Sequence, residues 1–208
     1  MLTLPMFYSC SSLILASSSP RRQQFLTQLG LVYKIIPAHI DETHQQDELP
    51  RDYVLRMAVR KAMSVAKAHP DAWVIGADTV ITIDGKNIVG KPSNDSEAMT
   101  SLKQLRNRTH QVLTGLCLHC ENKAIRNVHV EKTDVTFVNA PEEILEAYVR
   151  TGEPIDKAGA YGIQGIGSVL VKEINGSCTN VIGLPLSHLT SLLLQHKVIA
   201  TTFQNAAW

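Results

Sequence analysis

The feature that most constrains the fold is an apolar run that ends in a serine-rich turn and continues into a helix. Residues 13–16 read Leu-Ile-Leu-Ala, and a short apolar run bounded by serines is typical of a buried strand. Residues 17–22 follow as Ser-Ser-Ser-Pro-Arg-Arg. Because proline is favoured at the first position of a helix and serine directly before it, we expect a helix from Pro20 to about Leu29.

The rest of the chain continues to alternate between strand and helix patterns, which predicts an α/β fold with a mixed sheet. No linker, repeat or break in composition divides the chain, so we expect one domain over residues 1–208, with residues 1–12 as a loose leader. Helices are expected at residues 52–69, 94–105 and 141–150 and after Pro185, and strands at residues 32–36, 73–77, 80–83, 87–89, 109–119, 124–138 and 169–174.

The composition argues against several classes of partner and location. The net charge is only +1, so no overall field attracts nucleic acid or an anionic membrane, and 5% aromatic residues are too few for a base-stacking surface. No apolar stretch approaches the roughly 20 residues of a membrane span, and the first residues lack the basic segment of a signal peptide. Four scattered cysteines do not form a disulfide framework. We therefore expect a cytoplasmic protein that binds neither nucleic acid nor membrane.

The serine-rich turn is the first candidate site. Arg21 and Arg22 fall in the first turn of the predicted helix, where positive charge opposes the helix dipole. Free backbone N–H groups, three hydroxyls and two guanidinium groups around one turn can bind a phosphate. The alternative is an exposed arginine pair beside an ordinary helix cap, and the local sequence leaves both interpretations open.

Acidic residues follow two of the predicted strands. Asp78, in the Gly-Ala-Asp-Thr of residues 76–79, is expected at the carboxyl end of a strand, where α/β sheets usually bind ligands. It can hold a divalent cation, act as a base or do both, and the alternative is a hydrogen-bonded turn residue. Asp41 and Glu42 offer oxygen ligands suited to Mg²⁺ or Mn²⁺, unless they belong to an exposed acidic loop.

Three lysines and a glutamine complete the candidate residues. Lys61, Lys91 and Lys157, taken singly, are typical of surface lysines. The Gly-Lys-Pro around Lys91 is not a Walker A loop, and the glycines of residues 159–167 do not form a dinucleotide fingerprint. These glycines would still let the backbone approach a ligand. Gln164 lies among them, and its amide can read the edge of a nucleobase or serve as an ordinary turn residue.

Taken together and in this order, the motifs resemble the Maf family of nucleotide pyrophosphatases. The resemblance covers about residues 13–194, and the segment at residues 156–165 looks like the branch that acts on dTTP and UTP. It implies an elongated mixed sheet flanked by helices, with two lobes around a central cleft, as in inosine triphosphate pyrophosphatases. The motifs that carry it are residues 17–22, 41–42, 76–79, 90–92, 156–165 and 180–185.

The resemblance also implies a reaction and a set of site residues. The expected reaction is hydrolysis of dTTP and UTP to the monophosphate and pyrophosphate, with Mg²⁺ or Mn²⁺, in a protein that forms a homodimer. Asp78 matches the catalytic residue, and Glu42 with Asp78 matches the metal position. Arg21, Thr79 and Gln164 match positions linked to substrate choice, and Ser17, Arg22, Lys61, Lys91 and Lys157 match a polar and cationic cleft.

Two other functions stay open on the sequence. One is the same reaction on 7-methyl-GTP or another modified nucleotide, and the other is a nucleotide-sensing regulator of cell division without turnover. Asp78, Glu42 and the lysines favour turnover, because a sensor needs no base.

Gln164 also predicts which base is accepted. Its amide would pair with the O4 and N3–H edge of uracil or thymine. Cytosine presents the inverse pattern, so we expect CTP to be rejected.

Overall fold

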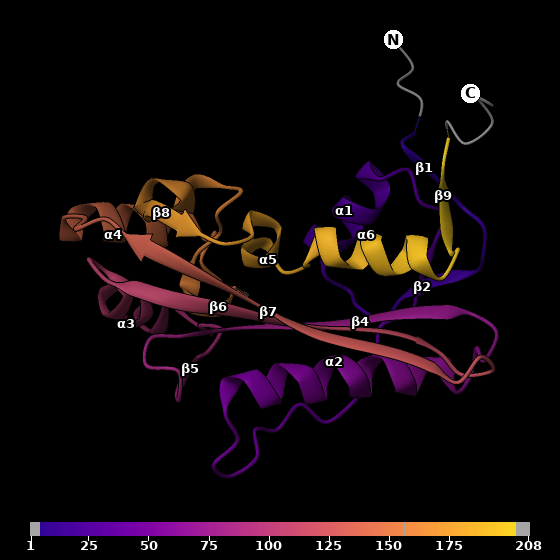
Figure 1. The fold of residues 1–208 in the computed structure, drawn as a ribbon. Coiled ribbons are helices and arrows are strands. Elements are labelled where there is room, and N and C mark those ends of the chain that lie inside the picture. Colours follow the sequence, from indigo (N-terminus) through magenta and orange to yellow (C-terminus); the bar gives the residue numbers. More distant parts are fainter. Residues whose placement is uncertain (1–4, 156, 203–208) are drawn as a thin grey trace.

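The computed structural model describes residues 5–155 and 157–202 of the chain. Strands and helices alternate along it (Figure 1). The strands are β1 (Phe7–Ser9), β2 (Leu13–Leu15), β3 (Lys34–Ile35), β4 (Trp73–Thr82), β5 (Ile88–Val89), β6 (Thr109–Cys120), β7 (Ile125–Phe137), β8 (Val171–Asn175) and β9 (Ile199–Thr201). The α-helices are α1 (Pro20–Gln28), α2 (Pro50–Ala66), α3 (Asp95–Leu105), α4 (Glu142–Arg150), α5 (Cys178–Ile182) and α6 (Leu186–Gln195), and short 3₁₀ helices cover Ala158–Ala160 and Ile166–Leu170.

Seven of the strands form one mixed sheet in the order β3-β2-β4-β6-β7-β8, with β5 paired to β4. β2 runs parallel to β3 and β4, whereas β4, β6, β7 and β8 are antiparallel neighbours. In Figure 1, α2 covers one face of the sheet, and α5 and α6 lie on the other side. The predicted α/β class, with a mixed sheet flanked by helices, is confirmed.

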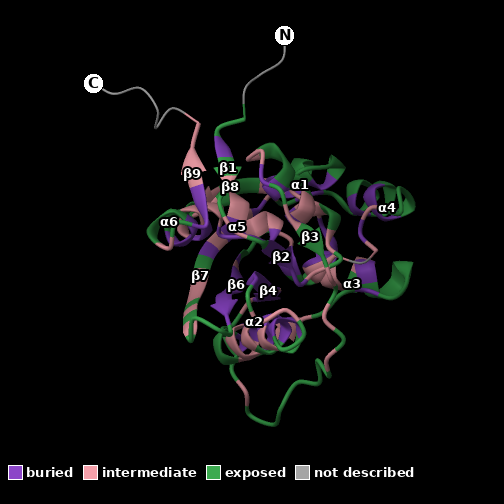
Figure 2. Cartoon of the chain, turned by 90° about the vertical axis from the view of Figure 1, so that its right-hand side faces the viewer, coloured by how far each residue is buried: buried purple, intermediate pink, exposed green. Residues whose placement is uncertain are grey.

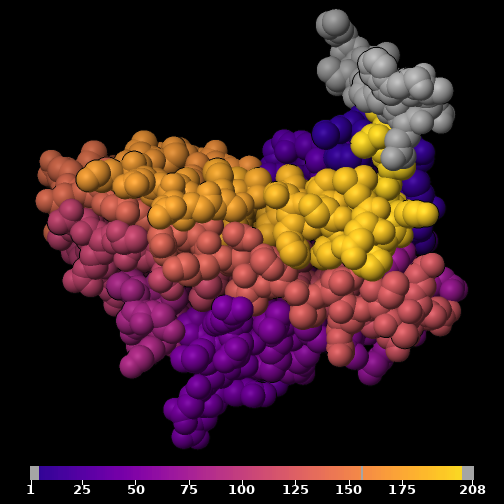
Figure 3. Space-filling model, in the orientation of Figure 1, coloured from indigo at the N-terminus to yellow at the C-terminus, as the bar shows by residue number. Residues whose placement is uncertain are grey.

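Separate apolar clusters give the molecule two lobes. One cluster packs α1 and α6 against the sheet around Leu15, Trp73 and Leu189. The other packs α3 and α4 around Leu102 and Phe137. The long strands connect the two clusters, and the molecule is elongated (Figure 3). β4 and β6 are buried almost throughout, between α2 and the helices of the opposite face (Figure 2).

Two glycines let α2 lie directly against the sheet. A Cβ atom at Gly76 on β4 would lie 2.2 Å from the Ala58 carbonyl oxygen, and one at Gly115 on β6 would lie 2.1 Å from the Val54 carbonyl oxygen. Such distances are far inside van der Waals contact, so only a residue without a side chain fits at either position. The contact brings the middle of α2 onto the middle of β4 and β6.

The strand that carries Asp78 is longer than the sequence predicts. β4 runs without a break, so the strands predicted at residues 73–77 and 80–83 are one strand. Asp78 and Thr79 lie in its middle, and the prediction that Asp78 ends a strand was wrong. The polar pair interrupts an apolar run and is therefore easily taken for a strand end. Pairing with β6 from Val74 to Thr82 supplies the backbone partners that keep the strand continuous.

Part of the predicted leader also belongs to the fold. Residues 7–9 form β1, which pairs antiparallel with β9, so these residues are not a loose segment. Residues 1–4 lie outside the described residues. The strand predicted at residues 169–174 begins at Val171, because a 3₁₀ helix covers the residues before it. The sequence patterns predict neither β9 nor α5.

The helices are short relative to a lipid bilayer. Within residues 5–155 and 157–202, none combines the length and the apolar character that a membrane span requires.

Candidate functional site

A cavity of about 1090 Å³ is lined by residues of both lobes. Its wall combines the start of α1, the loop before α2, the middle of β4, the β5 segment and the glycine-rich segment after α4. The structure thus brings together segments that are far apart in the sequence. Ten of the residues that the sequence singles out lie on this wall, namely Ser17, Arg21, Arg22, Glu42, Lys61, Asp78, Thr79, Lys91, Lys157 and Gln164. Asp41, the other candidate metal ligand, does not line the cavity, and its carboxylate accepts hydrogen bonds from Thr43.

A lysine joins two carboxylates on the cavity wall. Lys61 Nζ lies 2.7 Å from Asp78 Oδ1 and 3.0 Å from Glu42 Oε1. Lys61 and Asp78 are each only 9% exposed, so the interpretation of Lys61 as a surface lysine was wrong. A buried ammonium group requires a partner, and Asp78 supplies it. The close packing of α2 on β4 places the two side chains together.

Arg22 connects three segments of the wall. Its Nε donates to the Gly183 carbonyl oxygen at 2.8 Å, its Nη1 to Ser17 Oγ at 3.1 Å and its Nη2 to Thr79 Oγ1 at 3.1 Å. Burial lowers the pKa of the Arg22 guanidinium, and the nearby Asp78 carboxylate opposes that shift. Because three of its five N–H groups donate hydrogen bonds to protein atoms, Arg22 stabilises the arrangement of these segments.

Other polar side chains on the wall are available to a bound molecule. Arg21, Lys91 and Gln164 make no side-chain hydrogen bond or ion pair with the part of the chain that the structure describes. Lys157 differs, because its Nζ donates to the Glu153 carbonyl oxygen at 2.5 Å. The two arginines of the first helical turn therefore differ: Arg22 is engaged by the protein, and Arg21 is not.

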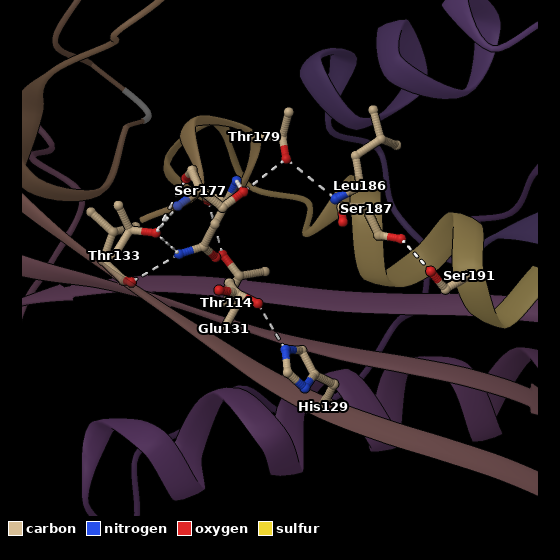
Figure 4. Close-up of polar contacts among 11 residues, drawn as sticks. Thr114, His129, Glu131, Thr133, Ser177, Thr179, Leu186, Ser187 and Ser191 are labelled. Carbon is tan, nitrogen blue, oxygen red and sulfur yellow. Dashed lines mark hydrogen bonds and ion pairs between the residues drawn. The ribbon is translucent and has the colours of Figure 1, made fainter. Parts of the chain in front are cut away.

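A chain of hydroxyl groups connects Thr79 to α5. Thr79 Oγ1 lies 2.9 Å from Thr114 Oγ1 on β6, and Thr114 donates to the Asn180 carbonyl oxygen at 3.2 Å. Asn180 is fully buried, and its amide donates to Thr133 Oγ1 at 2.9 Å. Figure 4 shows Thr133 beside Ser177, whose N–H donates to Thr133 Oγ1 at 3.0 Å. Sequence reasoning missed these supporting residues, because only Asn180 lies in a recognised motif and no role is assigned to it there.

The two carboxylates can share a divalent cation. One oxygen of each lies within 3.0 Å of Lys61 Nζ, so the two carboxylates are close together, with the ammonium group between these two oxygens. Carboxylate oxygens suit Mg²⁺, which is commonly held by one or two carboxylates together with substrate phosphates. Among the described residues, no group of three or more His, Cys, Asp or Glu side chains could hold a metal ion. The donor set therefore fits a cation that substrate oxygens or water also coordinate.

Comparison with known proteins gives a consistent result. Residues 12–196 match the model of the family described as Maf-like protein. A curated dTTP/UTP pyrophosphatase of Desulfotalea psychrophila is 48% identical over 93% of this chain and 99% of its own length. Curated proteins of the same name from Syntrophus aciditrophicus and Bacillus cereus are 46% and 42% identical, over 87% and 91% of this chain and 88% and 97% of their own lengths.

The fold has a counterpart among solved structures. The Staphylococcus aureus Ham1 protein superposes with a TM-score of 0.50 and 16% identity, over 89% of this chain and 99% of that chain. At this identity the likeness concerns the fold alone, and it agrees with the elongated two-lobed architecture expected from the sequence. Since the family model and the curated relatives match nearly the whole chain, this chain belongs to the Maf family.

Proposed function

We propose that this protein is a nucleoside triphosphate pyrophosphatase that hydrolyses dTTP and UTP to the monophosphate and pyrophosphate. The observation that carries the proposal is the buried Asp78 on the wall of a large cavity, paired with Lys61 and close to Glu42. A volume of about 1090 Å³ accommodates a nucleoside triphosphate. The choice of dTTP and UTP is supported by the names of the curated relatives.

The reaction requires a water molecule to attack the α-phosphorus. A bond forms between the water oxygen and the α-phosphorus, the bond from the α-phosphorus to the bridging oxygen breaks, and pyrophosphate leaves. In the proposal, Asp78 takes the proton of the attacking water and later releases it to solvent. Arg21 and Lys91 stabilise the negative charge that grows on the departing phosphates. Lys61 holds the Asp78 carboxylate in place, and Arg22 keeps the start of α1 next to β4.

Glu42 and Asp78 would hold a divalent cation in this proposal. Such a cation, when bound, supplies positive charge next to the triphosphate. Removing divalent cations with EDTA is expected to lower pyrophosphate release by at least about 100-fold, and added Mg²⁺ or Mn²⁺ should restore it. Glu42→Gln should raise the Mg²⁺ concentration needed for half-maximal rate, whereas Asp41→Asn, next to it on the same loop, should not. Full turnover in EDTA would contradict the metal requirement.

Gln164 is proposed to select the base. Its amide offers a donor and an acceptor that match the O4 and N3–H edge of uracil and thymine but not the edge of cytosine. We expect kcat/KM for UTP and dTTP to exceed that for CTP by at least about 100-fold, because a mismatched base would cover the Gln164 amide and leave its polar groups unpaired. Gln164→Ala should reduce this ratio, and Gln195→Ala, an exposed glutamine at the end of α6, should not.

A panel of triphosphates with a pyrophosphate readout tests the function. UTP and dTTP should be the best substrates, and equal hydrolysis of UTP and CTP would contradict the role of Gln164. A clear preference for 7-methyl-GTP would show that the protein performs the same reaction on another base. Binding of UTP without any pyrophosphate, with Mg²⁺ or Mn²⁺ present, would identify a nucleotide sensor instead of an enzyme.

Two expectations on the setting of the reaction complete the proposal. We place the enzyme in the cytoplasm, which holds the pool of its proposed substrates. We also propose that it forms a homodimer, on the family resemblance alone.

A further inference from the structure

The glycine-rich segment after α4 wraps around the carboxylate of Glu153. Glu153 Oε2 accepts a hydrogen bond from the Ile166 N–H at 2.9 Å, and Oε1 accepts one from the Gly167 N–H at 3.0 Å. The Tyr148 hydroxyl donates to the same Oε1 at 3.0 Å. Burial raises the pKa of Glu153, but these hydrogen bonds lower it, and the net shift is downward, as expected for a charged acceptor.

Tyr148 extends this arrangement to the start of the turn. Its ring is 2% exposed in the core of the α3–α4 lobe, so its hydroxyl has a fixed position. The Gly162 N–H donates to this hydroxyl at 3.2 Å. The segment from Gly162 to Gly167 is therefore held at both of its ends by one connected pair, Tyr148 and Glu153.

The positions of the glycines follow from this pair. A Cβ atom at Gly165 would lie 2.4 Å from Glu153 Oε2, and one at Gly167 would lie 2.4 Å from the Tyr148 hydroxyl oxygen. A side chain at either position would therefore displace the groups that hold the turn. The sequence suggested that these glycines let the backbone approach a ligand, but at these two positions the backbone approaches Glu153 and Tyr148.

Gln164 lies between these held points. It is exposed, lines the cavity and makes no side-chain hydrogen bond within the described ranges. We propose that Glu153 is a positioning residue for base selection: its carboxylate holds the turn of residues 162–167 and so fixes Gln164 against the base. This inference rests on the proposed function, because a nucleobase is present in the cavity only if the protein binds a nucleoside triphosphate. It adds a residue of the cavity wall whose proposed role is to hold the turn, through the hydrogen bonds of its carboxylate.

Glu153→Gln tests the proposal with almost no change in shape. The carboxylate accepts on both oxygens, whereas an amide has one acceptor oxygen, and its NH₂ group would face an N–H or O–H donor. We expect KM for UTP and dTTP to rise about tenfold, kcat to change less than about threefold, and the UTP:CTP ratio of kcat/KM to fall about tenfold. The amides of Ile166 and Gly167 should exchange with deuterium faster than in the wild type.

Glu146→Gln is the matched control, since Glu146 lies on α4 and pairs with the exposed Arg150. It should leave KM, kcat and the UTP:CTP ratio unchanged. If Glu153→Gln melts at so low a temperature that its kinetics report a loss of fold, the Tyr148→Phe variant tests the proposal instead. It keeps the buried ring and removes only the hydroxyl between Glu153 and the Gly162 N–H, and it should lower the UTP:CTP ratio in the same direction.

The outcomes separate this inference from the proposed function. Wild-type protein that releases no pyrophosphate from any triphosphate overturns the proposed function and this inference with it. Wild-type turnover of UTP, with an unchanged UTP:CTP ratio in Glu153→Gln and Tyr148→Phe, overturns the inference alone. An equal drop of kcat for UTP and CTP with KM unchanged also overturns it, because that pattern belongs to a general structural role.

Discussion

Asp78→Asn is expected to lower pyrophosphate release from UTP by about 10³-fold, near the middle of the range for loss of a general base. Asparagine has nearly the same shape as aspartate, and its amide oxygen can still accept the hydrogen bond from Lys61. The substitution removes the negative charge and the ability to take a proton. Initial rates of pyrophosphate release at saturating UTP and Mg²⁺ measure the effect, and circular dichroism checks that the fold is intact.

Asp71→Asn is the matched control for this substitution. Asp71 lies on the surface before β4 and bonds to Asn122 at 2.7 Å, so the same change of charge occurs outside the cavity. The control should retain wild-type turnover and thus show that net charge is not the cause. Near wild-type turnover in Asp78→Asn would rule out the assignment of Asp78 as the base.

Gly115→Ala is expected to destabilise the protein by about 1–3 kcal/mol, the usual range for overpacking a core. The new methyl group would lie 2.1 Å from the Val54 carbonyl oxygen, so α2 must move away from β6. For a chain of this length, each kcal/mol lowers the melting temperature by roughly 2–4 °C. Because α2 carries Lys61, its displacement also lengthens the contact with Asp78, and turnover should fall together with stability.

Gly90→Ala provides the comparison for the melting temperature. A Cβ atom at Gly90 meets no atom within 4 Å, so the added methyl group has space and the melting temperature should change little. An unchanged melting temperature in Gly115→Ala would show that α2 can shift at no cost. That result would contradict the view that Gly115 sets the distance between α2 and β6.

Local patterns predicted much of the fold, because many elements carry their own signals. Pro20 begins α1, and the Asn94 side chain accepts a hydrogen bond from the Glu97 N–H at the start of α3, as a capping pattern requires. The errors concern elements that depend on distant partners. β4 is continuous because β6 pairs along it, and β1 exists because β9, from the other end of the chain, lies beside it. The extent of the single domain stays a prediction.

The candidate residues line one cavity, and their roles there stay a prediction. Their environments could not be predicted from the sequence. Lys61 has the sequence context of a surface lysine, and only the packing of α2 on β4 buries it against Asp78. Glu153 carries no recognisable signal, because its partners are backbone N–H groups of a turn that forms more than ten residues later. Contacts of this kind depend on tertiary structure, which a single sequence does not show.

The mid-strand position of Asp78 has a consequence for how substrate choice can change in this family. Asp78 is fixed by a strand that pairs with β6 along nearly its whole length, whereas Gln164 lies on a turn held by one carboxylate and one hydroxyl. Under the proposed function, the group that performs the chemistry and the group that selects the base belong to different structural units. Substitutions in the turn can therefore redirect an enzyme to a new nucleotide while the sheet keeps the reaction itself unaltered.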